Sequence, residues 1–304
     1  MPTMALIECG SNSLKLHYHS RTTGDFHSMS LPWQLGHDVY QTGRLSEETL
    51  DQAVSMVEEL LRKGFDRKSL MAIATEGLRD AENRDVLLKQ LRDRLNLEVR
   101  VISGREEASL LAEGYVRLRR TIPAYLVDIG GGSLQLVRIS DEKTVLRDSL
   151  PLGAIRLYYL GEEDGKRWNK TFVEEYIRNT FEDACLMQMP EIHATGGTMK
   201  ALAHVLNKKT FVPDEVDKTL ADVEREGPPA SLKPERQRVF LPGLLVLSHL
   251  LRSCATVTVH YLKIPVGRIF LERILDRLGL LSDGRGKTVL FNQMRITNIR
   301  SKLT

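Results

Sequence analysis

Two short turns rich in small residues are the first candidates for chemistry in this sequence. In VDIGGGSLQLV, residues 127–137, an apolar run ends in Asp128, and three glycines and a serine lead into a second apolar run. Glycines let the backbone approach a ligand closely and direct several N–H groups at one anion, most often a phosphate. Alone, the pattern is equally compatible with a tight β-hairpin that binds nothing.

A second copy of the pattern occurs near the N-terminus, in IECGSNSLKLHY, residues 7–18. The acid, the first glycine and the last serine coincide in the two copies: Glu8 with Asp128, Gly10 with Gly130, and Ser13 with Ser133. A repeat at this separation indicates duplicated domains rather than a short-period solenoid. Two such hairpins facing each other across a cleft would grip a phosphate chain from both sides.

Composition narrows the class of protein. The chain has 304 residues, of which 42% are hydrophobic and 27% charged, enough for two domains with cores of their own. A net charge of +3 is too mild to indicate a nucleic-acid partner. Cys9, Cys185 and Cys254 have no paired spacing, which predicts neither disulfides nor a zinc site and fits the cytoplasm.

The hydrophobic pattern predicts an α/β fold without a membrane span. The most apolar stretch, residues 241–251, is far shorter than the ~20 residues that cross a bilayer and is expected to be a buried helix. The N-terminus lacks the basic start of a signal peptide. Ser46 and Ser103 each mark a helix start, strands alternate with helices, and the Pro-rich stretch 225–237 is expected to be a loop.

Eight sequence blocks together resemble one family. In order they are IECGSNSLKL, LGHDVYQTGRLSEE, ATEGLRDAENRD, VISGREEASLL, VDIGGGSLQLV, LPLGAIRL, ATGGTMKAL and KPERQRVFLPG. Their order and spacing, over roughly residues 5–274, are similar to those of the exopolyphosphatase and guanosine pentaphosphate phosphohydrolase family. Eight collinear blocks are far more specific than one glycine-rich turn.

The resemblance implies a fold and an activity. The fold is that of acetate and sugar kinases, actin and heat-shock chaperones, with two ribonuclease H-like domains around a cleft. We expect these at residues 1–120 and 121–304, with the last ~20 residues able to pack back on the first domain. The implied reaction is hydrolysis of a terminal phosphate from polyphosphate or guanosine pentaphosphate with Mg²⁺ or Mn²⁺, in a homodimer without the C-terminal helical domains of longer relatives.

The resemblance also assigns roles to single residues. Glu107 matches the catalytic base, although an isolated helix carboxylate is more often merely solvated. Asp128 and Glu8 match catalytic and metal-binding acids, and Gln135 stands at a third metal position. The implied phosphate ligands are Gly10, Ser11, Asn12, Ser13, Lys15, Arg79, Gly130, Gly131, Gly132, Ser133, Gly196, Gly197, Thr198 and Lys200. For the three cations, Lys15, Arg79 and Lys200, an ordinary surface salt bridge or a solvated side chain is the alternative interpretation.

Several departures from the family pattern leave the function open. Glu8 replaces an aspartate, Gln135 replaces an acid, Gln34 stands where arginine is common, and Arg238 stands where an acid is usual. Residues 259–270 differ as well. A hydrolase with altered substrate preference and a catalytically weakened polyphosphate or nucleotide sensor both fit. A kinase-like ATPase of the same superfold is a third possibility, which the separate motif blocks disfavour.

Overall fold

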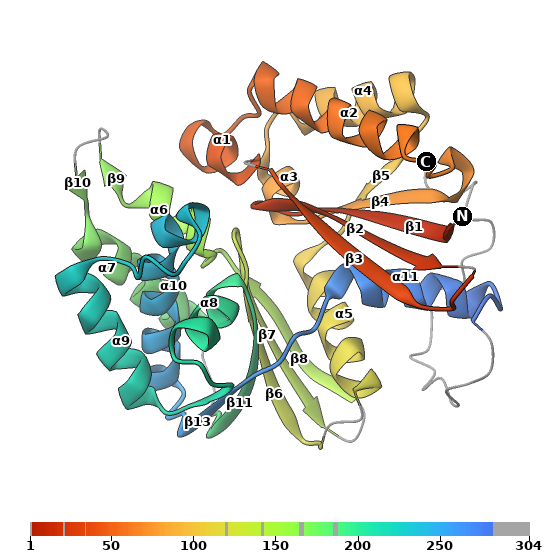
Figure 1. Cartoon of the computed structure of the whole chain (residues 1–304). Coiled ribbons are helices and arrows are strands. Elements are labelled where there is room, and N and C mark those ends of the chain that lie inside the picture. The colour runs from red at the N-terminus through yellow and green to blue at the C-terminus, as the bar shows by residue number, and fades with distance from the viewer. Residues whose placement is uncertain are drawn as a thin grey trace.

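The computed structural model describes residues 2–20, 22–33, 35–118, 121–140, 143–163, 167–184 and 188–281. Gln34 and Cys185 lie outside the described residues, as do residues 119–120, where the domain border was expected, and the segment after residue 281. The described chain forms two β-sheets, each with its own set of helices (Figure 1).

The first sheet has the strand order β3-β2-β1-β4-β5. Its strands are β1 (Pro2–Cys9), β2 (Ser13–Ser20), β3 (Phe26–Pro32), β4 (Leu70–Ala74) and β5 (Val99–Val101). β1, β2 and β3 form an antiparallel meander, whereas β4 and β5 pair in parallel on the other side of β1. The accompanying helices are α1 (Leu35–Thr42), α2 (Glu47–Arg62), α3 (Glu76–Asp80) and α4 (Arg84–Leu95), with a short 3₁₀ helix at Arg67–Ser69.

The second sheet repeats this plan, with the order β8-β7-β6-β11-β13-β12. Its strands are β6 (Ala124–Ile129), β7 (Leu134–Ser140), β8 (Lys143–Leu150), β11 (Glu191–Gly196), β12 (Thr210–Phe211) and β13 (Thr258–Tyr261). β6 pairs antiparallel with β7 and parallel with β11, as β1 pairs with β2 and β4. The α/β class and the two ribonuclease H-like sheets expected from the internal repeat are thereby confirmed.

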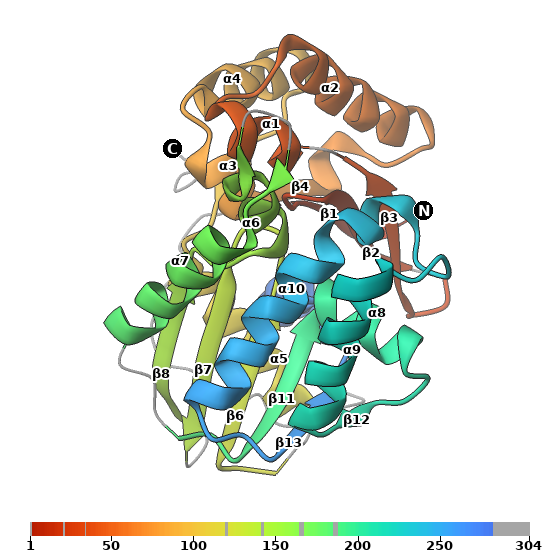
Figure 2. The same cartoon turned by 90° about the vertical axis from the view of Figure 1, so that its left-hand side faces the viewer.

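The helices of the second half cover one face of its sheet. They are α6 (Ala154–Leu160), α7 (Lys170–Asp183), α8 (Gly197–Val205), α9 (Pro213–Glu226) and α10 (Pro234–Ser253), and a small ribbon of β9 (Glu162–Glu163) and β10 (Arg167–Trp168) follows α6. Figure 2 shows α8, α9 and α10 in front of the sheet, with α5 (Gly104–Arg117) behind it. In the described part of the chain, no helix is both long and apolar enough to cross a membrane.

Local sequence explains where these helices begin. Ser46 Oγ accepts a hydrogen bond from the Thr49 amide, and Ser103 Oγ accepts one from the Glu106 amide, so both predicted N-caps are confirmed. α10 begins at Pro234, inside the stretch expected to be a loop, because proline needs no N–H partner in the first turn. The loop is therefore shorter, residues 227–233, and α10 is the buried helix expected from its apolar run.

Two helices connect the halves of the molecule. α5 packs against β7 and β8 of the second sheet, whereas α11 (Val266–Arg277) returns to pack against β1 and β2 of the first sheet and against α5 itself (Figure 1). One core cluster accordingly includes residues of both sheets, such as Leu6 and Leu126. Among the described residues α11 returns to the first sheet, whereas the last ~20 residues, expected to be able to pack there, lie outside the described part of the chain.

We expect a bulky side chain at Gly114 to break the contact between α5 and α11. A Cβ there would lie 2.5 Å from Ile264 Cγ2 and 3.0 Å from Ile269 Cγ1. Gly114→Val should lower the free energy of unfolding by about 1–3 kcal/mol, as overpacking does in other cores. Ser55→Val, at an exposed position of α2, is the control and should change it by less than about 0.5 kcal/mol. Equal stability of the two variants in urea titrations would contradict this packing.

Candidate active site between the two hairpin turns

The two hairpin turns have the same geometry and meet each other. The Gly10 amide donates to the Ser13 carbonyl at 3.1 Å, and the Gly130 amide donates to the Ser133 carbonyl at 2.9 Å. A Cβ placed on Gly131 would lie 3.1 Å from the Cβ of Ser11, in the other turn. The turns of the first and second sheets therefore meet each other, as the repeat predicted. We call the boundary where Gly131 and Gly132 lie against Ser11 the seam.

Glycine is required at Gly132 because the first half of the molecule lies directly against it. A Cβ there would lie 3.0 Å from Ser11 Oγ and would collide with the Tyr40 hydroxyl. Ser11 is buried and its hydroxyl lies 3.2 Å from that of Tyr40, while Asn12 and Ser13 are half-buried in the same turn. Both predicted turns thus lie at the seam.

Glu107 lies in the first turn of α5, with its carboxyl group inside the protein. Its Oε2 atom is buried and has no hydrogen-bond partner among the described residues. Burial, followed by repulsion from Asp128, raises the pKa of Glu107 to about 8. A carboxylate with this pKa can accept a proton near neutral pH, which is the property a general base needs.

Asp128 ends β6 beside the second turn. Burial is the main reason that its pKa is raised to about 6, with Lys15 lowering it and Glu8 raising it further. Its Oδ1 atom would lie only 2.5 Å from a Cβ on Gly196, a residue with φ of +97°. The third predicted turn, after β11, therefore lies directly against Asp128.

Glu8 has a different environment from Asp128, although the two residues are equivalent in the repeat. Its Oε1 accepts from Lys15 Nζ at 2.5 Å, and its Oε2 accepts from His17 Nε2 at 3.1 Å and from the Gly267 amide of α11 at 3.0 Å. Burial alone would raise the pKa of Glu8, but Lys15 and His17 hold it well below the usual range. Both oxygens of this carboxylate are already bound by the protein.

Lys15 reaches from β2 into the seam. Burial opposes its charge, but Glu8, Asp128 and Glu107 raise its pKa, so the ammonium stays protonated. Gln135 holds the corresponding position opposite Asp128 in the second hairpin. Its Nε2 donates to Ser133 Oγ at 2.6 Å and lies 3.3 Å from Ser149 Oγ, so the buried amide holds the second turn in place.

The donors that would hold a divalent ion do not fit the expected set. Within the part of the chain that the structure describes, no group of three or more histidines, cysteines or acids is arranged to hold a metal. Glu8 is bound by Lys15, His17 and Gly267, and Gln135 contributes no charge. Of the three residues expected to bind the ion, only Asp128 keeps an anionic side chain that forms no ion pair among the described residues, so the expected donor set is incomplete.

A residue that sequence reasoning missed lies on the third turn. The guanidinium of Arg236, in the first turn of α10, occupies the space that a Cβ of Gly197 would enter. Burial lowers the pKa of Arg236, and among the described residues no carboxylate forms an ion pair with it. A cation beside the N-terminus of α8 favours an anion there. Arg236 was missed because its sequence, KPERQ, was interpreted as part of a loop.

The other two residues predicted on the third turn are not brought into the seam. Thr198 is buried and packs against Gly243 of α10, and Lys200 is exposed on α8. In a helix of 3.6 residues per turn, residues 198 and 200 face different directions from the glycines that precede them. Thr198 therefore supports the packing of α8.

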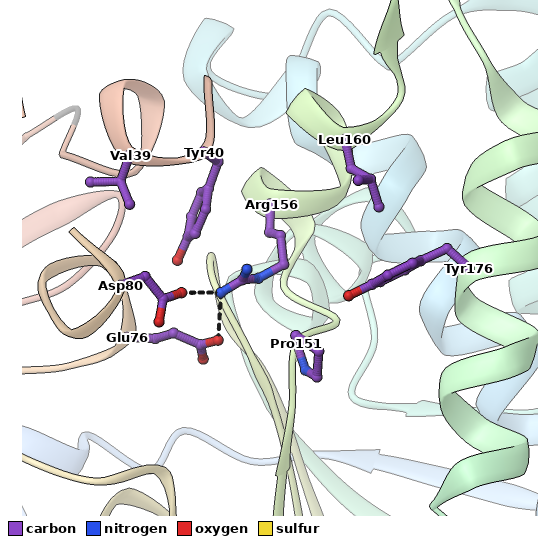
Figure 3. A pocket seen from close by; sticks show the side chains of 8 residues that line it. All are labelled: Val39, Tyr40, Glu76, Asp80, Pro151, Arg156, Leu160 and Tyr176. Atoms are coloured by element: carbon purple, nitrogen blue, oxygen red, sulfur yellow. Dashed lines mark hydrogen bonds and ion pairs between the residues drawn. The ribbon is translucent and has the colours of Figure 1, made fainter. Parts of the chain in front are cut away.

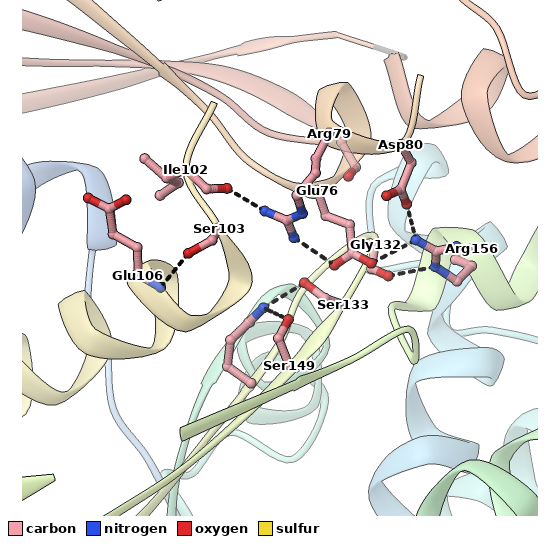
Figure 4. Close-up of polar contacts among 12 residues, drawn as sticks. Glu76, Arg79, Asp80, Ile102, Ser103, Glu106, Gly132, Ser133, Ser149 and Arg156 are labelled. Atoms are coloured by element: carbon pink, nitrogen blue, oxygen red, sulfur yellow. Dashed lines mark hydrogen bonds and ion pairs between the residues drawn. The ribbon is translucent and has the colours of Figure 1, made fainter. Parts of the chain in front are cut away.

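Arginines connect α3 of the first half with the second half. Arg79 donates to the Ile102 carbonyl at 2.5 Å and lies 3.4 Å from Glu76 Oε2 (Figure 4). Arg156 of α6 donates to the Gly132 carbonyl at 2.8 Å, to Glu76 Oε1 at 2.7 Å and to Asp80. Arg79 is thus engaged by Ile102 and Glu76, and its contact with phosphate stays a prediction, whereas Arg156 connects the second turn to α3.

A cavity of about 500 Å³ adjoins this arginine contact. Figure 3 shows Arg156 at its centre, between the two acids of α3 and Tyr176. The Arg156 guanidinium also lies 4.6 Å from the centre of the Tyr40 ring. The sequence blocks contained Glu76, Asp80 and Arg156, but only the fold shows that they meet.

Comparison with known proteins identifies the family. A profile of the Ppx/GppA phosphatase family matches residues 27–264, and the chain belongs to this family. Exopolyphosphatase 1 of Mycobacterium tuberculosis is 28% identical over 165 residues, which cover 51% of this chain and 47% of that protein. The guanosine-5′-triphosphate,3′-diphosphate pyrophosphatase of Vibrio parahaemolyticus is 26% identical over 288 residues, 81% of this chain and 54% of that protein. The chain spans about half the length of these curated relatives.

Solved structures share the fold. An exopolyphosphatase-like protein superimposes with a TM-score of 0.74 at 22% identity, covering 91% of this chain and 98% of that one. The Ppx/GppA family member of Aquifex aeolicus gives a TM-score of 0.68 at 21% identity, with 90% and 98% covered. An exopolyphosphatase from Cytophaga hutchinsonii gives 0.72 at 18% identity, with the same coverage. The resemblance and the fold class inferred from the motifs are confirmed.

The raised pKa of Glu107 predicts a pH-dependent cost in stability. Its folded pKa of about 8 exceeds the ordinary value of 4.5, so between these values the folded chain holds a proton that the unfolded chain has lost. The contribution of Glu107 to the free energy of unfolding is fully present below pH 4.5 and is lost as the pH rises toward 8. The melting temperature of Glu107→Gln, relative to that of the unmodified chain, should therefore rise by a few degrees from pH 5 to pH 9. A constant difference would show that the carboxyl ionises normally.

Proposed function

We propose that this chain is a hydrolase that releases terminal phosphate from inorganic polyphosphate or guanosine pentaphosphate. Membership in the Ppx/GppA phosphatase family gives the class of reaction. The observation that carries the proposal is Glu107, whose buried Oε2 atom has no partner among the described residues and lies near Asp128 and the converging turns. A partnerless buried carboxylate oxygen is costly to fold, and a substrate water would give it a partner.

The chemistry follows from this placement. Glu107, once ionised, accepts a proton from the attacking water, and the oxygen of that water forms a bond to the terminal phosphorus as the bridging P–O bond breaks. The N–H groups of residues 11–13 and 131–133 stabilise the charge on the transferred oxygens, as preorganised donors do in other enzymes. Arg236 places positive charge beside Gly197 of the third turn, and Lys15 places it beside Glu8.

Two substrate classes stay open because each has a named relative. The mycobacterial relative is an exopolyphosphatase, and the Vibrio relative is a guanosine-5′-triphosphate,3′-diphosphate pyrophosphatase. Both substrates present a terminal phosphoanhydride to the same cations. Homodimer formation and a cytoplasmic location stay predictions, whereas the donors present do not fit the expected Mg²⁺ or Mn²⁺.

The alternative function is a sensor that binds these substrates without useful turnover. It is favoured by one observation, the engagement of Glu8 by Lys15 and His17, because this removes an acid that the family motif places in the catalytic set. The two functions differ in a single assay, since only the hydrolase releases phosphate while remaining folded.

Removal of the proposed base should abolish turnover. Glu107→Gln is expected to lower the rate of phosphate release from long-chain polyphosphate by ~10²–10⁴-fold, with a near-native circular dichroism spectrum. Glu106→Gln, which loses only the ion pair with Arg100, is the matched control and should stay within about twofold of the unmodified chain.

The pH dependence of the same assay tests the role of Glu107. The rate for the unmodified chain should rise with pH and level off above pH 8, because the base must be ionised. An active Glu107→Gln variant, or a rate that is already maximal at pH 6, would contradict this role. An inactive unmodified chain that still binds phosphate would favour the sensor.

Arg236 should contribute to substrate binding more than its neighbour does. Arg236→Gln removes the cation beside Gly197 and is expected to raise the KM for polyphosphate by about tenfold, the size of one lost charge-assisted contact. Arg238→Gln, at an exposed position two residues further along α10, is the control. Equal KM values for the two variants would show that Arg236 does not contact the substrate.

A further inference from the structure

The environment of Glu8 differs from that of a metal ligand. A magnesium ion binds carboxylate oxygens at about 2.0–2.1 Å and demands near-ideal octahedral geometry. Glu8 Oε1 already holds the Lys15 ammonium at 2.5 Å, and Oε2 holds His17 and the Gly267 amide. A divalent ion at Oε1 would have to sit beside an ammonium group, and the two cations would repel each other strongly.

The Lys15 ammonium lies where several negative groups converge. It interacts electrostatically with Asp128 and Glu107 as well as with Glu8. Its side chain is 44% exposed, although its anchor Glu8 is only 8% exposed. One end of the ion pair is thus fixed inside the protein, and the other faces the seam.

The repeat shows why the cation is on one side only. Lys15 is the cross-strand partner of Glu8, and Gln135 is the cross-strand partner of Asp128. The first hairpin therefore contributes a carboxylate with its own counter-ion, and the second contributes a carboxylate opposite a neutral amide. Across the seam, Lys15 lowers the pKa of Asp128. The positive charge of Lys15 therefore also acts electrostatically on the second hairpin.

We infer that Lys15, anchored by Glu8, supplies at the phosphate site the positive charge for which the family pattern predicts a divalent ion, so that phosphate binds here without a metal. Glu8 is then the residue that positions Lys15. The inference rests on the proposed function only in taking the seam as a phosphate site, and it applies to the hydrolase and to the sensor alike.

Equilibrium dialysis with radiolabelled inorganic phosphate tests the inference without turnover. The dissociation constant for the unmodified chain should be the same in EDTA and in excess Mg²⁺. Lys15→Gln should weaken binding by about tenfold or more, and Lys15→Arg should restore most of it. Lys89→Gln removes a lysine from an exposed ion pair on α4 and should leave binding unchanged. Phosphate binding that requires Mg²⁺, or that is unaffected by Lys15→Gln, overturns the inference.

Two further measurements keep the test decisive if Lys15→Gln folds poorly. Glu8→Gln keeps the lysine but removes the carboxylate that positions it, so phosphate binding in EDTA should weaken. In electron paramagnetic resonance with Mn²⁺ alone, the unmodified chain should hold no ion. Phosphate binding by Glu8→Gln that is as tight as that of the unmodified chain, or bound Mn²⁺ that Asp128→Asn releases, overturns the inference. Absence of phosphate release from polyphosphate would instead overturn only the hydrolase.

Discussion

The crowding of carboxylates at one seam is the constraint on which the rest of this structure depends. Asp128, Glu76 and Glu8 all raise the pKa of Glu107, and Glu8 also raises that of Asp128, across the boundary between the two sheets. Buried charges of one sign are costly unless each is paired or neutralised. Glu8 is paired with Lys15, and Glu76 with Arg156. Among the described residues the buried Oε2 atom of Glu107 has no hydrogen-bond partner, and burial followed by repulsion from Asp128 raises the pKa of this carboxyl group.

The two halves of the molecule stay in contact at the seam because elements from both pack across it. α5 carries Glu107 and packs on the second sheet, and α11 contacts the first sheet and gives an amide to Glu8. Arg156 connects the second turn to α3. Each of these contacts joins segments that are far apart in the chain, so the site is assembled only when both sheets are formed. Small changes in this packing would therefore alter the spacing of the phosphate-binding turns.

Much of the fold could be predicted from the sequence because its signals are local. The matching turns of the two hairpins follow from glycine, serine and a strand-end acid, and the caps at Ser46 and Ser103 follow from side chains within three residues of their partners. The start of α10 was missed because Pro234 was interpreted as a loop residue, although proline is well suited to the first turn of a helix.

The candidate site could be predicted only in part because its electrostatics depend on long-range contacts. Motif matching placed Glu107, Asp128 and both hairpin turns correctly at the seam. It could not show that Gly267 and His17 bind the Oε2 atom of Glu8, or that Arg236 lies against Gly197. A lysine opposite a glutamate on neighbouring strands is an ordinary pair in a sheet. A role of this pair in phosphate binding can be inferred only from the fold, which places the second hairpin against it.

The central claim is that Glu107 is a buried acid that becomes a base near neutral pH. Infrared difference spectroscopy of the unmodified chain, with Glu107→Gln subtracted, measures this directly through the carbonyl stretch of the protonated carboxyl. The account predicts a band that disappears with a midpoint near pH 8. Loss of that band near pH 4.5, as for a solvated glutamate, would contradict the account.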